Sequence, residues 1–225
     1  MKYGDTATSR RDAPDAKRRT GRPPLTERRK AETRMEIARE TVRLFTSKGV
    51  AATSADEIAE AVGISTRTLR RYFPSKEACV QPLLAAGAEA VTQRLRTWPS
   101  GRTLKEAVND WKDGDSLMDE PDVAASLDLI RLTRTEPDLK VVWLRTYHEY
   151  DGQLAEILAE RAGCGPGDLH IRIQAATINA ALRVAAEHYA WRERDGRAEP
   201  GQDESAGLWE ALRTAVLTVA QGLPD

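Results

Sequence analysis

The sequence predicts an all-α protein with about nine helices, and three observations support that prediction. Alanine is abundant, no run of alternating polar and apolar residues marks a strand, and long stretches repeat apolar residues at intervals of three and four positions. Apolar residues form 40% of the 225-residue chain, which is enough for a packed core. We expect a disordered basic arm over residues 1–25, a small helical domain over 26–76 and a larger helical domain over 77–225.

Charge is divided unevenly along the chain. Residues 1–76 contain 18 Lys and Arg against 10 Asp and Glu, a net charge of +8. The 149 residues that follow contain 16 against 25, a net charge of −9. A basic first third before an acidic remainder favours a nucleic-acid-binding part joined to a part with another role. Uneven surface charge without a nucleic-acid partner is the alternative.

The sequence excludes several classes of protein. Cys79 and Cys164 fit no metal-binding or redox spacing, and no apolar run reaches the roughly 20 residues of a membrane span. The polar N-terminus lacks the apolar core of a signal peptide, so we expect a cytoplasmic protein. Catalytic signatures such as GxSxG, HExxH and the phosphate-binding loop are missing. We therefore expect no enzyme activity, no catalytic residue, no cofactor and no metal site.

The basic arm contains one motif. Gly21–Pro23, flanked by more basic residues, resembles the core of an AT-hook, which lies in the narrow minor groove of A·T-rich DNA. On this interpretation Arg18, Arg19 and Arg22 contact DNA. The match is partial because Thr20 stands where that motif usually has Arg. A solvated basic tail is the alternative, and both versions add salt-dependent attraction to phosphates.

A first helix is expected from about Glu27 to Lys48. Thr26 is suited to its N-cap, and Gly49 ends it as a C′ glycine. One apolar face follows from the spacing of Ile37, Ala38, Thr41, Leu44 and Phe45.

Two short helices joined by a tight turn follow. Ser54 and Glu57 form a capping box at the start of the first of them, and Gly63 makes the turn. Ser65 caps the second, which is expected over residues 66–73 and is followed by a proline.

The outer side of the second short helix is basic. Leu69 points inward together with Tyr72 or Phe73. The side chains left outside are Thr66, Arg67, Arg70 and Arg71. This is the layout of a helix-turn-helix, which places its second helix in the major groove of DNA, where one Arg can donate two hydrogen bonds to guanine worth about 1–3 kcal/mol of discrimination. A solvated charged face is the alternative.

At this point the sequence resembles a known family. The run Thr53–Ser65, followed by Thr68–Leu69 and Tyr72–Glu77, is similar to the DNA-binding domain of the TetR family of bacterial transcriptional regulators. Arg67 replaces a frequent Gly of that family, and Arg70 replaces a frequent Tyr. Both departures fall where the family meets the bases, so the resemblance implies DNA binding without carrying over a relative's operator sequence.

The resemblance also implies which residues contact DNA. Phosphate contacts are implied for Thr53, Ser54, Tyr72 and Lys76. Contacts from the exposed side of the recognition helix are implied for Ser65, Thr66, Arg67, Arg70 and Arg71. Lys76 has a further argument, because we place it in the first turn of the next helix, where a cation does not suit the helix dipole and a phosphate would explain its presence.

The larger domain is expected to contain six helices. They run over about residues 76–97, 104–112, 121–135, 137–161, 168–194 and 204–221, with breaks containing glycine or proline between most of them. Pro82 falls in the second turn of the first of these helices, where it removes a backbone hydrogen bond and can bend the helix.

The helix over residues 168–194 has two apolar stripes, which predicts contact with two neighbours. The second stripe consists of Ile173, Ala176, Ala180 and Val184. The TetR resemblance implies that the last two helices pair with those of a second subunit, which gives a homodimer that binds a palindromic operator in double-stranded DNA. Packing of both stripes within one subunit is the alternative.

The same resemblance implies a pocket for a small-molecule effector between the helices over 76–97 and 168–194. Aromatic residues three and four apart on the 137–161 helix are suited to line one wall, and a histidine is suited to orient a polar group. The candidate ligand residues are Trp111, Trp143, Tyr147, His148 and Tyr150. An ordinary aromatic core is the alternative, and sequence does not identify the ligand.

These expectations combine into one function. We expect a sequence-specific DNA-binding transcriptional regulator, a homodimeric repressor that a small-molecule ligand releases from its operator. Two alternatives stay open: an architectural protein for A·T-rich DNA, and a ligand-independent regulator or activator.

Overall fold

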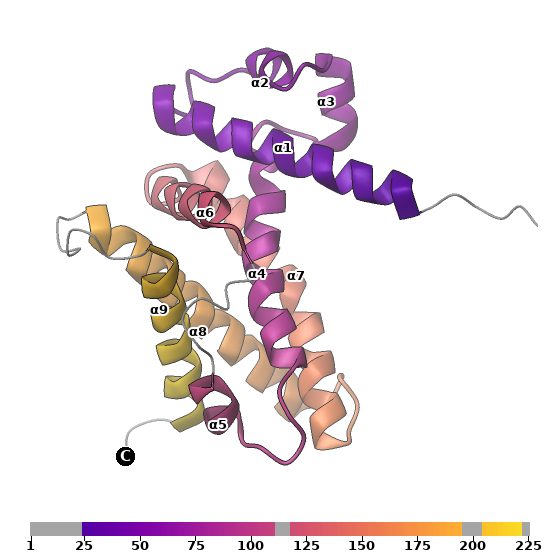
Figure 1. The fold of residues 1–225 in the computed structure, drawn as a ribbon, viewed down its shortest axis with the longest axis vertical. Helices are drawn as coiled ribbons and strands as arrows, with labels where there is room; N and C mark the ends of the chain where they lie inside the picture. The colour runs from indigo at the N-terminus through magenta and orange to yellow at the C-terminus, as the bar shows by residue number, and fades with distance from the viewer. Residues whose placement is uncertain (1–23, 111–117, 195–203, 222–225) are drawn as a thin grey trace, which may run out of the picture.

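The computed structural model describes residues 24–110, 118–194 and 204–221, and these residues form nine α-helices, one 3₁₀ helix and no strand (Figure 1). The all-α prediction is confirmed. The α-helices are α1 Pro24–Lys48, α2 Ala55–Ala61, α3 Thr66–Tyr72, α4 Gln81–Arg96, α5 Leu104–Asn109, α6 Glu120–Leu132, α7 Pro137–Ala162, α8 Leu169–Arg194 and α9 Glu204–Gln221. The 3₁₀ helix η1 (Glu77–Val80) connects α3 to α4.

The helices α1, α2 and α3 form a small domain at one end of the molecule (Figure 1). Its core is built from the apolar faces that helical spacing places on one side of each helix. The largest side chains there, each 2% exposed or less, are Ile37, Phe45, Ile58, Leu69 and Phe73. Arg34 covers the edge of this core, with its guanidinium carbon 4.9 Å from the centroid of the Phe73 ring.

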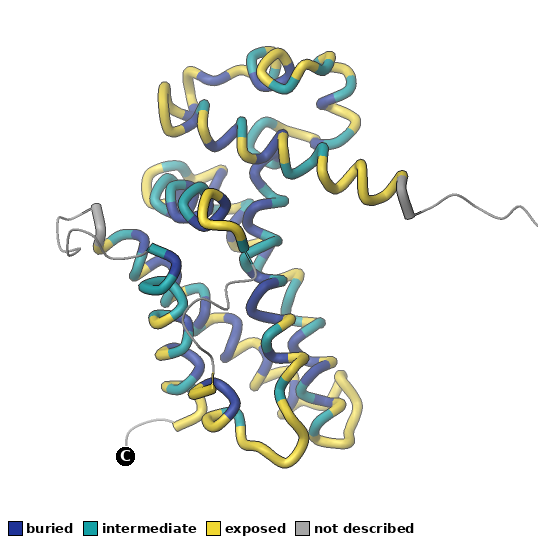
Figure 2. The backbone as a smooth tube through the Cα atoms, in the orientation of Figure 1, coloured by how far each residue is buried: buried dark blue, intermediate teal, exposed yellow. Residues whose placement is uncertain are grey.

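The remaining helices form the larger domain. α4 leads away from the small domain and packs against α7, while α8 packs against both α7 and α9. α6 packs beneath α1, and α5 packs against α9 at the far end (Figure 1). The buried residues, dark blue in Figure 2, follow the inner sides of these helices. α6 is therefore a member of the larger domain that also touches the small one.

An ion pair joins the two domains at this contact. Arg39 of α1 donates two hydrogen bonds to the Asp122 carboxylate of α6, from Nε to Oδ1 over 2.6 Å and from Nη2 to Oδ2 over 2.7 Å. The Asp122 side chain is 10% exposed and the Arg39 side chain 48%. Two parallel charge-assisted hydrogen bonds add geometric restraint as well as energy, so α6 is held in a defined position against α1.

Two helix starts differ from the prediction. α1 begins at Pro24, so Thr26 lies inside the first turn and the prediction that it is the N-cap is wrong. α4 begins at Gln81, after a separate 3₁₀ turn, which places Pro82 in the first turn. Because a first-turn N–H has no partner within its helix, proline costs nothing there, and the predicted loss of a hydrogen bond in a second turn does not occur.

Candidate functional site

The start of α2 has the capping box that the sequence predicts. Ser54 Oγ accepts a hydrogen bond from the Glu57 N–H (3.2 Å), and the Glu57 carboxylate accepts one from the Ser54 N–H (2.8 Å). Lys48, at the end of α1, forms an ion pair with Glu57. The hydrogen bonds from Lys48 and Ser54 lower the pKa of the Glu57 carboxyl to about 2. α2 is thereby anchored to the end of α1.

Gly63 makes the turn between α2 and α3, as predicted. Its φ of 68° lies in the left-handed region that favours glycine. The turn is closed by hydrogen bonds from the Gly63 N–H to the Glu60 carbonyl (3.0 Å) and from the Ile64 N–H to the Ala59 carbonyl (2.9 Å). The chain therefore changes direction within a few residues and leads into α3.

Polar contacts fix the start of α3. Ser65 is the N-cap, and its Oγ accepts a hydrogen bond from the Thr68 N–H (3.2 Å). Thr66 Oγ1 donates to the Asp56 carboxylate of α2 over 2.5 Å. Leu69 is buried on the inner side of the helix. These contacts set both the position of α3 and the side that it turns to solvent.

That outer side presents three guanidinium groups. Arg67, Arg70 and Arg71 are all exposed, and the Arg71 guanidinium lies 5.7 Å from the centroid of the Tyr72 ring. Among the residues that the structure describes, Arg67 and Arg70 have no ion-pair partner. Their N–H groups are available to base edges or phosphates, and the major groove of B-DNA is wide enough to admit an α-helix.

Two residues expected to contact phosphates have partners inside the small domain. Thr53 is 2% exposed, and its hydroxyl donates to the Gly49 carbonyl (2.9 Å). Lys76 Nζ donates to the Val50 and Thr53 carbonyls (2.6 and 2.9 Å). Lys76 precedes η1 and is not part of α4, so the helix-dipole argument for a phosphate was wrong. Backbone carbonyl groups account for its position.

The other predicted contacts lie around α2 and α3. Ser54 and Ser65 are exposed at the two N-caps, and Thr66 and Tyr72 are half-buried at the two ends of α3. The contacts predicted for the arm lie outside the described residues; they are Arg18, Arg19 and Arg22.

Comparison with known proteins identifies the family. Residues 37–83 match the family model described as bacterial regulatory proteins, tetR family, and residues 102–200 match one described as the MftR C-terminal domain. The chain is 30% identical over 190 residues to the HTH-type transcriptional regulator TcmR of Streptomyces glaucescens, across 80% of this chain and 83% of TcmR. The chain belongs to the TetR family.

Two further comparisons place this TetR-family protein among its relatives. It is 27% identical over 196 residues to MftR of Mycobacterium tuberculosis, across 87% of this chain and 93% of MftR. Its fold is similar to that of Salmonella enterica GusR, with a TM-score of 0.50 at 20% identity over 84% of this chain and 96% of GusR. TcmR is a transcriptional regulator, and the matched N-terminal family model describes bacterial regulatory proteins. The protein is thus a DNA-binding transcription regulator, and α1–α3 are its DNA-binding head.

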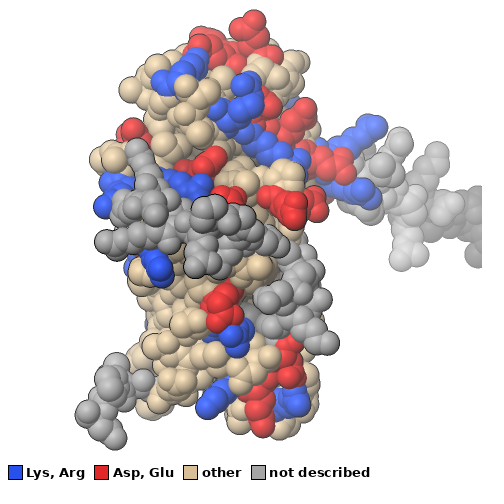
Figure 3. All heavy atoms as spheres, turned by 60° about the vertical axis from the view of Figure 1, so that its left-hand side comes forward, with Lys and Arg blue, Asp and Glu red and all other residues tan. Residues whose placement is uncertain are grey.

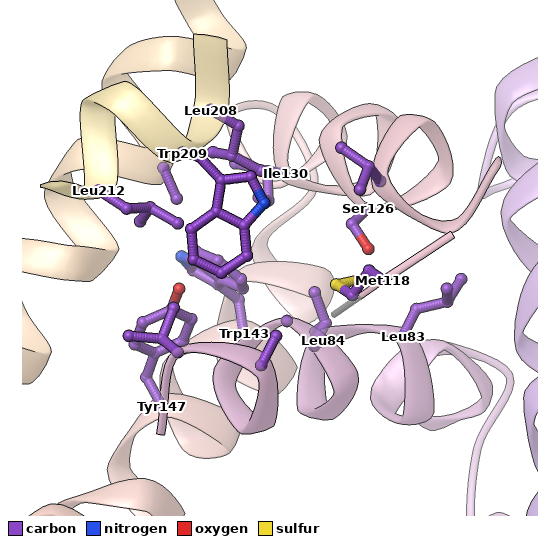
Figure 4. Close-up of a pocket in the computed structure, with 15 residues that line it drawn as sticks. Leu83, Leu84, Met118, Ser126, Ile130, Trp143, Tyr147, Leu208, Trp209 and Leu212 are labelled. Atoms are coloured by element: carbon purple, nitrogen blue, oxygen red, sulfur yellow. The ribbon is translucent and has the colours of Figure 1, made fainter. Parts of the chain in front are cut away.

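A cavity of about 50 Å³ lies within the larger domain of this TetR-family protein (Figure 4). Helices α4, α6, α7, α8 and α9 all contribute to its wall, which is mostly apolar and contains no charged side chain from the described residues. The aromatic lining residues are Trp143, Tyr147 and Trp209. The polar lining group on α6 is the hydroxyl of Ser126. The sequence predicted a pocket between α4 and α8 with one wall from α7. The parts of the wall that come from α6 and α9 depend on packing and were not predicted.

The structure separates the predicted ligand residues. Trp143 and Tyr147 line the cavity, whereas Tyr150 donates to the Ala85 carbonyl (3.0 Å) and borders a smaller neighbouring cavity. His148 is wrongly placed by the prediction, because its side chain is 83% exposed on the outer side of α7 and contacts Asp151. Neighbouring residues of a helix point in different directions, so His148 faces solvent although Tyr147 beside it lines the cavity. The fifth candidate, Trp111, lies outside the described residues.

Trp143 is held in the cavity wall by a buried carboxylate. Its Nε1 donates to Glu187 Oε1 (2.8 Å), and Lys140 and Arg183 form ion pairs with the same carboxylate. Burial alone would raise the pKa of Glu187, but the hydrogen bonds from Lys140 and Trp143 and the charges of Lys140 and Arg183 lower it. Burial raises the pKa of the Tyr147 hydroxyl, so this polar group of the cavity stays uncharged at neutral pH.

The second apolar stripe of α8 is exposed. Ile173 and Val184 are each 54% exposed, and Ala176 and Ala180 are exposed as well. The alternative that both stripes pack within one subunit is therefore wrong. In Figure 3, charged side chains of both signs are spread over the DNA-binding head. No helix in the described part of the chain is both long and apolar enough to span a membrane.

Proposed function

We propose that this protein is a homodimeric repressor that a small molecule releases from its operator. The observation that carries the proposal is the double role of α6, which lines the cavity and also holds α1 through the Arg39–Asp122 pair. A ligand that changes the position of α6 therefore acts on the DNA-binding head. It shifts the equilibrium only if it binds the DNA-free state more tightly than the DNA-bound state.

The proposed DNA contacts divide into two kinds. Arg67 and Arg70 contact bases, because they are exposed on α3 and have no ion-pair partner among the described residues. Contacts to phosphates come from Ser54, Ser65, Thr66, Arg71 and Tyr72 around the ends of α2 and α3. Thr53 and Lys76 act on phosphates only in addition to their internal hydrogen bonds.

The exposed stripe of α8 supports the homodimer. Its alanines allow two helices to approach closely, and burial of the larger side chains would remove apolar surface from water. TetR regulators bind DNA as dimers. A two-fold dimer presents two copies of α3 to half-sites about one helical turn apart, roughly 34–36 Å, so we propose a palindromic operator.

The arm and the domain division complete the proposal. Residues 1–25 extend the grip on DNA, residues 26–76 contact the operator, and residues 77–225 bind the effector and the second subunit. The protein acts on the bacterial chromosome in the cytoplasm. Deletion of residues 1–25 tests the arm: a lower salt dependence of binding with the palindrome preference retained supports it, whereas loss of most affinity favours an architectural role on A·T-rich DNA.

Footprinting on the promoter next to the protein's own gene tests the operator. We expect one protected palindrome, and the absence of any protected palindrome would overturn the claim. Arg67→Ala should weaken binding to that site about 5- to 100-fold while changing nonspecific binding little. Arg43→Ala is the control, since Arg43 is exposed on α1 and paired with Glu40. Equal losses on specific and nonspecific DNA would make Arg67 a phosphate contact.

A further inference from the structure

We propose that the cavity binds an uncharged, largely apolar ring compound that carries one hydroxyl or carbonyl group, and that this group hydrogen-bonds to Ser126. This inference rests on the proposed function in one respect: the molecule bound in the cavity is taken to be the effector. It concerns the chemistry of the ligand, and it is argued from three features of the cavity wall.

The first feature is a buried hydroxyl without a partner. Ser126 is 7% exposed, and its Oγ has no hydrogen-bond partner within the described part of the chain. Other buried hydroxyls of this domain bond to the carbonyl one turn earlier: Thr92 to Ala88 (2.8 Å) and Thr146 to Val142 (2.9 Å). Figure 4 shows the Ser126 oxygen pointing toward the cavity and α4. Buried polar groups are rarely left unpaired, so a ligand oxygen is the partner that this hydroxyl lacks.

The second feature is a glycine inside a helix at the cavity wall. Gly87 lies in the middle of α4, where glycine is less favourable than alanine. Of the described residues, an added Cβ would meet only the Met118 sulfur, at an ordinary contact distance of 3.8 Å. Neither close packing nor an unusual backbone angle therefore requires glycine here. What glycine preserves is free space in the cavity.

The third feature is the chemistry of the remaining wall. Among the described residues no charged side chain lines the cavity, and an ionised group buried without a partner is strongly unfavourable. The described part of the wall therefore disfavours a charged ligand and favours an uncharged one. The Trp143, Tyr147 and Trp209 rings favour a flat ring system, because aromatic rings stack or meet edge to face.

The cavity must enlarge to admit such a ligand. Its volume of about 50 Å³ is little more than that of one or two water molecules. Figure 4 shows the Trp209 indole of α9 reaching across the space toward α4 and α7. Trp209 is only half-buried, so we place the displacement that admits the ligand at this side chain. Ser126 lies one helical turn from Asp122, and a ligand bonded to Ser126 therefore acts beside the pair that holds α1.

A competition experiment with the full chain tests this chemistry. The fluorescence of 1-aminoanthracene, an uncharged ring compound, should rise on binding. We expect 2-naphthol to displace it at concentrations about 2- to 10-fold lower than naphthalene, which is the gain from one neutral hydrogen bond. The naphthol advantage should disappear in Ser126→Ala. We expect 2-naphthoate, which has the same rings and a negative charge, to compete at least about 10-fold more weakly than naphthol. Equal competition by naphthol and naphthoate, or an unchanged naphthol advantage in Ser126→Ala, would overturn the proposal.

Two glycine variants locate the site. Gly87→Leu should weaken 1-aminoanthracene binding at least about tenfold by filling the cavity, whereas Gly152→Leu should leave it unchanged. Gly152 is the matched control because it is an exposed helical glycine with nothing within 4 Å of an added Cβ. If Gly87→Leu does not fold, Gly87→Ala replaces it, since its methyl group fits, and a smaller loss of affinity is expected. Equal binding by the position-87 and position-152 variants would place the ligand elsewhere.

Operator release separates this inference from the proposed function. If the ring compounds bind in a manner that depends on Gly87 and Ser126 but release no DNA, ligand-induced release is wrong and the cavity chemistry stands. If a compound releases DNA from Gly87→Leu as well as from the wild type, release stands and the cavity assignment is wrong.

Discussion

Replacing Arg39 should destabilise the protein more than neutralising its partner Asp122. Arg39→Ala removes two donors, at 2.6 and 2.7 Å, from a carboxylate that is 10% exposed. Asp122→Asn leaves a guanidinium that is 48% exposed and that water can solvate. Breaking a fully buried pair costs about 3–5 kcal/mol. Since half of this pair is exposed, we expect about 2–3 kcal/mol for Arg39→Ala and about 1 kcal/mol for Asp122→Asn.

Urea unfolding of the two single variants and the double variant measures these free energies. The double variant should be more stable than Arg39→Ala alone, because it has no unpaired carboxylate. Arg43→Ala is the matched control: Arg43 lies one turn along α1 in an exposed pair with Glu40, worth about 0.2–1 kcal/mol. An Arg39→Ala cost no larger than that of Arg43→Ala would refute the reasoning. A double variant no more stable than Arg39→Ala alone would also refute it.

Three further predictions concern the DNA-binding head and the exposed stripe. The pKa of Glu57 is about 2 in the folded state and about 4.3 in the unfolded state. The stabilisation from the ionised Glu57 carboxylate is therefore complete above about pH 4.3 and is lost as the pH falls toward 2. Wild type should therefore lose more stability than Glu57→Gln between about pH 5 and pH 3 in urea unfolding, and parallel losses would contradict this. Gly63→Ala should destabilise the folded protein by about 1–2 kcal/mol because the φ of Gly63 is positive, whereas Gly152→Ala in α7 should stabilise it by about 0.5–1 kcal/mol. Thermal unfolding compares the two variants, and equal effects would exclude backbone strain at Gly63. Val184→Glu should give a monomer by light scattering while Gly152→Glu stays dimeric, and a dimeric Val184→Glu would exclude the α8 stripe as the interface.

The parts of the fold that sequence predicted are set by local chemistry. Ser54 with Glu57, Ser65 and Gly63 act on backbone groups within four residues, so their spacing alone places α2, the turn and α3. Thr103 and Glu106 form the same capping box at the start of α5, which the same rule could have found.

The parts that sequence did not predict depend on distant contacts. Lys76 is positioned by carbonyl groups more than twenty residues earlier in the chain. Patterns of residues a few positions apart do not predict such a contact. The cavity depends on which sides of α6 and α9 meet α4. The sequence predicted α6 as a helix, but only packing shows that Ser126 faces the cavity and that His148 faces solvent.

Lys76 also has a consequence for operator recognition. Its ammonium ties the segment after α3 to the loop before α2, while Lys48 and Glu57 tie α1 to α2. The helices around the recognition helix are thus cross-linked and should move as one rigid body. A bound ligand would then alter the separation and tilt of two such bodies without altering the base preference of either. Operators that differ only in the spacer between half-sites should consequently differ in their response to ligand.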